Sequence, residues 1–138
     1  MNLNTATARM ILAEIQAAWN AAASTWNPDA FAALYTEDAL FFGGRPDHCV
    51  GGAAIHAYFA SYQDVLESAT LDLVDQHFLW LADDCFLAQG FGDFAFVLEG
   101  GKRTSRARMR TTLVIAQHAS VWKIRQHHFS VPPESPPI

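Results

Sequence analysis

The chain has 138 residues, of which 51% are hydrophobic, and its formal net charge is −5. This size predicts one domain over residues 1–132 with a full apolar core, and the negative charge argues against a nucleic-acid partner. No apolar run approaches the ~20 residues that span a bilayer, and residues 1–7 lack the pattern of a signal peptide. We therefore expect a cytoplasmic protein with no membrane partner. Cys49 and Cys85 have no metal-site spacing, so we predict free thiols, no metal and no cofactor.

The first half of the chain predicts three helices and one short strand. Apolar residues at 3–4 spacing indicate helices over residues 5–25 and 52–67. Between them, Pro28 behind Asn27 starts a short helix that runs to about residue 35. Residues 39–42 form a short strand, which the glycines that follow it interrupt. The residues that carry the helical spacing are Ile11, Ile15, Trp19, Ala22, Ile55, Phe59 and Tyr62.

The second half predicts four long strands, over residues 70–82, 85–98, 103–117 and 121–131. Short polar or glycine-rich turns separate them, which is typical of a meander of hairpins. The proline-rich residues 133–138 cannot pair in a sheet centre, and we expect an extended tail. The fold class is therefore α+β, with the helices packed on one face of a curved, mainly antiparallel sheet.

The last two strands alternate between two faces, and each face changes from apolar to polar along its length. We predict that one face of each strand lines a pocket whose far end is polar. On the third strand this face holds Met109, Thr111 and Leu113, opposite three arginines. A one-residue register slip would instead place Arg110 beside His128 and favour an anionic ligand. The predicted pocket face of the last strand consists of Trp122, Ile124, Gln126, His128 and Ser130.

Four stretches of the chain, taken together, carry a family resemblance. They are LYTEDALFFG at 34–43, DHCVGGAAI at 47–55, RTTLV at 110–114 and WKIRQHHFS at 122–130. In order and spacing the chain resembles the nuclear transport factor 2-like superfamily, in its SnoaL-like branch. It is also similar there to the association domains of calcium/calmodulin-dependent kinase II. The resemblance implies a cone-shaped, cystatin-like fold, a pocket between sheet and helices, and a homodimer through the sheet face.

The catalytic and ligand-binding residues of well-known members of this superfamily are not found at the matching positions of this chain. The carboxylate base of the ketosteroid isomerases aligns with Gly43, and their oxyanion partners align near Trp19 and Thr111. The pocket arginines of the kinase association domains align with Gly90, Leu113 and Phe129. The resemblance therefore supports the ketosteroid isomerase-like fold, and neither that isomerase chemistry nor a carboxylate-binding pocket of that type.

His128 is the main candidate for chemistry, as a general base or a ligand-binding group at the polar end of an apolar face. The alternative is a core histidine satisfied by its neighbours. Asp47, in a loop before the third helix, is the second catalytic candidate. The pair Asp75 and His77 shares a strand face, and we favour structural pairing at a subunit interface over catalysis. His127 points away from His128, so the two cannot bind one metal from a regular strand.

These observations predict a protein that binds a small apolar or aromatic molecule. An enzymatic role would be a cofactor-independent isomerisation, dehydration or cyclisation, with His128 and Asp47 as catalytic groups. The alternative is a non-catalytic association domain that dimerises through the sheet and its arginine stripe. The predicted pocket-lining residues are Trp19, Tyr58, Met109, Thr111, Gln126 and Ser130.

Overall fold

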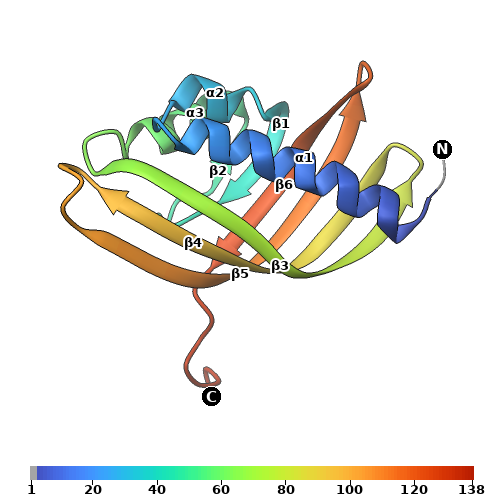
Figure 1. The fold of residues 1–138 in the computed structure, drawn as a ribbon. Helices are drawn as coiled ribbons and strands as arrows, with labels where there is room; N and C mark the ends of the chain where they lie inside the picture. The colour runs from blue at the N-terminus through green and yellow to red at the C-terminus, as the bar shows by residue number, and fades with distance from the viewer. Residues whose placement is uncertain (1–2) are drawn as a thin grey trace.

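The computed structural model describes residues 3–138, which form three helices and six strands (Figure 1). Residues 1 and 2, where the signal-peptide pattern was sought, lie outside the described residues. The helices are α1 (Thr5–Ala23), α2 (Pro28–Ala32) and α3 (Gly52–Ala60). The strands are β1 (Tyr35–Phe42), β2 (Cys49–Val50), β3 (Leu66–Ala82), β4 (Cys85–Leu98), β5 (Thr104–His118) and β6 (Val121–Ser130). None of the helices within residues 3–138 has the length and apolarity needed to cross a bilayer.

All six strands belong to one sheet, in the order β2-β1-β6-β5-β4-β3. Neighbouring strands are antiparallel except β1 and β6, which are parallel. Helix α1 crosses the inner face of the curved sheet, and α2 and α3 lie together at one end of it (Figure 1). The predicted α+β class with a mainly antiparallel sheet is therefore confirmed.

Local signals account for most of the element boundaries. The Asn4 side chain accepts from the Thr7 backbone N–H at 2.7 Å and caps α1, and Asn27 caps α2 in the same way. The prediction that the third helix continues to residue 67 was wrong. It ends at Ala60, where the Ser61 hydroxyl donates to the Tyr58 carbonyl at 2.6 Å, and β3 begins at Leu66. The two-residue strand β2 was not predicted.

Strand β3 contains a β-bulge that reverses which residues face inward. Val74 pairs with Phe91 and His77 pairs with Gln89, so Asp75 and Gln76 together oppose the single residue Gly90. Asp75 takes a left-handed backbone conformation, with φ of 53°. From Ala69 to the bulge the inward side chains are odd-numbered, such as Leu71, and after it they are even-numbered, such as Gln76.

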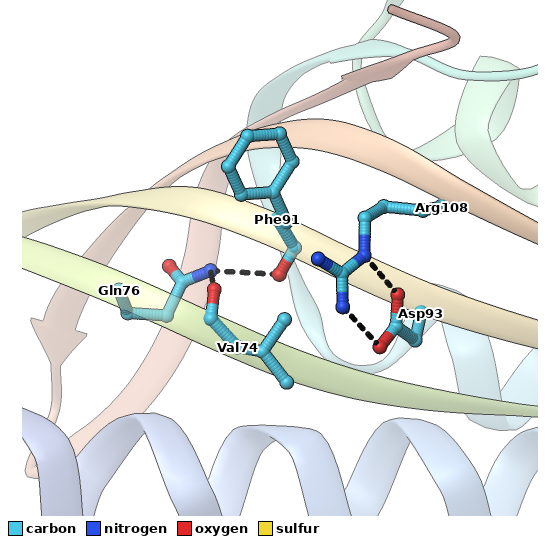
Figure 2. Close-up of polar contacts among 5 residues, drawn as sticks. All are labelled: Val74, Gln76, Phe91, Asp93 and Arg108. Atoms are coloured by element: carbon cyan, nitrogen blue, oxygen red, sulfur yellow. Dashed lines mark hydrogen bonds and ion pairs between the residues drawn. The ribbon is translucent and has the colours of Figure 1, made fainter.

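The Gln76 amide anchors this bulge to the next strand. Its Nε2 donates to the carbonyls of Val74, at 3.3 Å, and Phe91, at 3.0 Å (Figure 2). Figure 2 also shows that Arg108 and Asp93, on neighbouring strands, form a two-pronged ion pair at 2.7 and 3.0 Å. This arginine holds the pKa of the Asp93 carboxyl below its usual range.

A second bulge interrupts β6. Ile124 pairs with Ile115 and Gln126 pairs with Val114, which leaves Arg125 as the extra residue. Trp122 and Ile124 therefore face the core on one side of the bulge, and His127 and Phe129 face it on the other. The predicted shared face from Trp122 to Ser130 was wrong, because the alternation changes phase at Arg125.

Candidate functional site

An apolar cavity of about 280 Å³ lies between the helices and the inner face of the sheet. Its deep end is walled by nearly fully buried aromatic rings, including Trp19, Phe59 and Phe94. Gly44 and Ser105 are exposed lining residues and mark its mouth. The complete lining is Trp19, Trp26, Gly44, Tyr58, Phe59, Tyr62, Leu66, Phe94, Phe96, Leu98, Ser105, Met109 and Phe129.

The Tyr58 hydroxyl is a polar group of this lining that is held in place by a backbone hydrogen bond. It accepts a hydrogen bond from the Gly44 backbone N–H at 2.8 Å. A Cβ on Gly43 would lie 2.4 Å from the same hydroxyl oxygen, so the absence of a side chain there makes room for the phenol. Burial raises the pKa of Tyr58, partly offset by the Gly44 hydrogen bond, and the hydroxyl stays protonated at neutral pH.

A buried polar pair lies beside the cavity rather than in its lining. The Tyr35 hydroxyl and His127 Nδ1 are 3.0 Å apart, and both residues are almost fully buried. Burial lowers the pKa of His127 to about 3, so its imidazole is neutral at physiological pH. Burial also raises the pKa of Tyr35, with a smaller opposing effect from the Trp19 indole N–H.

Two buried polar nitrogens around the Tyr35–His127 pair lack a hydrogen-bond partner among residues 3–138. His127 Nε2 and Trp19 Nε1 are buried, and neither has a hydrogen-bond partner of good geometry among residues 3–138. His127 is also packed against the rings of Phe41 and Phe129, with ring centres 5.5 and 5.1 Å away. The imidazole therefore lies one aromatic layer behind the cavity wall.

Three residues predicted to line a pocket, Trp19, Tyr58 and Met109, line this cavity. Thr111 lies on the inner face as predicted, but its side chain is buried outside the cavity, 3.4 Å from Gln76 Nε2. Gln126 and Ser130 lie on the opposite, outer face of the sheet, and so does His128, because of the bulge at Arg125. Placing these three in an inner pocket was therefore wrong.

His128 lies instead in a shallow polar groove on the outer face of the sheet. Arg110 is in the same groove, so the structure brings these two residues together outside the apolar cavity. Asp75 and His77 also line it, and they share a face as predicted. The imidazole of His128 lies 5.3 Å from the ring of Phe42, on the neighbouring strand β1.

Asp47 and Cys49 lie near the start of β2, away from the cavity lining. Asp47 is exposed in the loop between β1 and β2. Cys49 is buried, and burial together with the nearby Asp47 carboxylate raises the pKa of its thiol. A raised thiol pKa is the opposite of what an activated nucleophile needs. Within residues 3–138, no cluster of His, Cys, Asp or Glu side chains could hold a metal ion.

A row of mostly apolar residues crosses the outer face through all six strands. Each member pairs with the next across the sheet, and Gln126 is the one polar member. Val50, Leu40 and Leu79 are 62%, 43% and 63% exposed. We call this set the outer row: Val50, Leu40, Gln126, Val114, Leu87 and Leu79.

The sequence reasoning missed the buried Tyr35–His127 pair and much of the cavity wall. His127 was assigned to the outer face by regular alternation, and only the pairing of β6 with β5 reveals the bulge. Phe94 and Phe96 alternate along β4 with the correct phase, which is a usable signal for that wall. Tyr62 follows α3, four residues after Tyr58, at the spacing that brings side chains to one side.

The SnoaL-like domain model matches residues 12–134, and the chain therefore belongs to the SnoaL-like family. Its fold resembles solved structures of the nuclear transport factor 2-like superfamily. A Xanthomonas campestris protein named for the calcium/calmodulin-dependent protein kinase II association domain is 26% identical. That match covers 93% of this chain and 89% of the other, with a TM-score of 0.82.

Two further structures share the fold at lower identity. A nuclear transport factor 2-like protein from Salmonella enterica is 18% identical over 97% of both chains, with a TM-score of 0.77. The hexachlorocyclohexane dehydrochlorinase of Novosphingobium barchaimii is 10% identical. It matches over 93% of this chain and 88% of its own, with a TM-score of 0.72. Among proteins with curated descriptions, none matches the chain in sequence.

Proposed function

We propose that the protein binds a small, largely apolar molecule in the cavity between its helices and sheet. The observation that carries this proposal is the aromatic lining of a 280 Å³ space that opens beside Tyr58. A dry apolar cavity of roughly 150 Å³ is enough to hold benzene, so this space accommodates one substituted ring or two fused rings. Membership of the SnoaL-like family, and the naming of a relative as a dehydrochlorinase of a cyclic halocarbon, agree with a ligand of this kind.

Binding is favoured over acid–base catalysis by the composition of the lining. Among residues 3–138, none that lines the cavity carries a carboxylate, imidazole or amine, whereas a general base must come within hydrogen-bond reach of the proton that it removes. His128 and Asp47, the predicted catalytic groups, lie outside this space. An isomerase, dehydratase or cyclase would therefore need His127 to become accessible through the aromatic wall.

Filling the cavity from the sheet side is expected to weaken ligand binding. Met109→Trp adds bulk inside the lining, and we expect naphthalene affinity to fall at least about fivefold because the added indole occupies part of the apolar space. Isothermal titration calorimetry with wild type and variant measures the change. Met10→Trp is the matched control, since Met10 is 60% exposed on α1. Equal affinity in wild type and Met109→Trp would rule out the cavity as the binding site.

The outer row favours a second function, association of two copies of the chain through the sheet face. Its side chains form a mostly apolar line across six strands, which a symmetric dimer can bury against itself. Two outer-face arginines are already paired within the chain, Arg108 with Asp93 and Arg125 with Asp38. Burying this face therefore does not require leaving these two charges unpaired.

Placing a charge in the outer row is expected to separate the copies. Leu79→Glu puts a carboxylate at the β3 end of the outer row, within the proposed contact, where burial without a partner is unfavourable. We expect light scattering at micromolar concentration to report a dimer for wild type and a monomer for the variant. Met10→Glu places the same charge on the exposed face of α1 and should leave the dimer intact. A monomeric wild type would contradict this second proposal.

A further inference from the structure

Tyr58 occupies a special position because it brings a hydrogen-bond donor to a cavity that otherwise has few polar groups. Its oxygen already accepts from the Gly44 N–H at 2.8 Å, which orients the phenol at the mouth of the cavity. A phenol that accepts one hydrogen bond still has its own O–H to donate. Among residues 3–138 the Tyr62 hydroxyl is the one side chain whose hydrogen bonding raises the pKa of Tyr58, so a ligand acceptor would take the place of that contact.

The other polar groups of the lining do not compete for this role. The Trp26 indole N–H is already used, because it donates to the Phe59 carbonyl at 2.8 Å. The Tyr62 hydroxyl lies beside Gly44 as well, next to that of Tyr58, and so extends the donor group at the mouth. None of the described residues that line the cavity has a charged side chain. Arg45 lies over the ring of Tyr62, with its guanidinium carbon 4.3 Å from the ring centre, and it donates to the Ser61 hydroxyl at 2.8 Å.

We infer that the cavity selects a neutral ligand that carries one hydrogen-bond acceptor, such as a ketone, aldehyde or ether on an apolar ring, with the acceptor held by Tyr58. This inference rests on the proposed binding function and names the ligand class of the same site. An ionised ligand is disfavoured, because its charge would lose water without gaining an ionic partner. A ligand without an acceptor gains no hydrogen bond from the Tyr58 O–H.

The test compares two probes of similar shape, acetophenone and ethylbenzene, in wild type and in Tyr58→Phe. Calorimetric titration should show acetophenone binding weakened about fivefold to tenfold by Tyr58→Phe, the effect of one neutral hydrogen bond. Ethylbenzene, which has no acceptor, should change less than twofold. Tyr62→Phe is the matched control and should weaken acetophenone less than Tyr58→Phe does. Benzoate should bind wild type at least about tenfold more weakly than acetophenone.

A measurement on wild type alone keeps the inference testable if Tyr58→Phe does not fold. The infrared carbonyl stretch of bound acetophenone should shift to lower frequency than in an apolar solvent, as a hydrogen-bonded carbonyl does. An unshifted band, equal losses for both probes in Tyr58→Phe, or benzoate binding as tight as that of acetophenone would overturn the ligand class while leaving the cavity as a binding site. Binding of neither probe to wild type would overturn both the ligand class and the proposed function.

Discussion

Acidification from pH 7 to pH 4.5 is expected to destabilise the fold by about 2.5 kcal/mol through His127 alone. The pKa of this imidazole is lowered from 6.5 to about 3 by burial, with a small contribution from His128. Below pH 6.5, His127 therefore binds a proton in the unfolded chain but stays neutral in the folded chain. The stability contribution is fully present above the unfolded pKa, and it falls by about 1.4 kcal/mol per pH unit until the folded pKa is reached.

Neighbouring histidines provide the matched variants for this prediction. His127→Gln removes the buried titrating group and can still hydrogen-bond Tyr35, so the free energy of unfolding should depend less steeply on pH. His128→Gln removes an exposed imidazole on the other face, which is only the secondary cause of the low pKa of His127, so it should change the slope far less. Urea unfolding at several pH values between 7 and 4.5 measures both slopes. Equal slopes in wild type and His127→Gln would show that His127 does not control the acid sensitivity.

The two histidines also show where sequence reasoning succeeds and where it stops. On β5 the alternation is regular, so Met109 was assigned to the cavity side and the arginines to the outer side, as the structure has them. On β6 the same reasoning reversed His127 and His128. Arg125 is the extra residue in the pairing of β6 with β5, and no local feature of the sequence marks it as such.

Cavity-lining residues on the helices could be predicted from the sequence for a different reason. Trp19 and Tyr58 lie on helices whose apolar spacing is a local signal, joined in α1 by the capping residue Asn4, and both line the cavity. The shape of the cavity depends instead on which rings meet across the layers. The stacked pair Phe31 and Phe59, with ring centres 4.0 Å apart, joins α2 to α3. Such contacts form between segments distant in sequence, and a single strand or helix pattern does not specify them.

Because of the bulge on β3, we expect Gly90→Ala to lower the free energy of unfolding by a large amount. A Cβ at Gly90 would lie 2.5 Å from the Asp75 carbonyl oxygen and 2.7 Å from Gln76 Nε2. The first contact is with backbone, so a side-chain rotation cannot relieve it. We expect the free energy of unfolding to fall by about 3 kcal/mol, the range of severe overpacking.

The reason for so large an effect is that the bulge sets the phase of the whole strand. If β3 paired without it, either Leu71 or the later residues Phe78 and Trp80 would have to leave the inner face. Gly92→Ala is the matched control, because Gly92 lies on β4 like Gly90. Its Cβ would meet the ends of side chains, the nearest being Leu71 Cδ1 at 2.9 Å. Those side chains can rotate, so we expect a loss of only about 1 kcal/mol in urea unfolding. A Gly90→Ala protein as stable as Gly92→Ala would mean that the Asp75–Gln76 backbone can shift, and that the bulge does not hold the strand in phase.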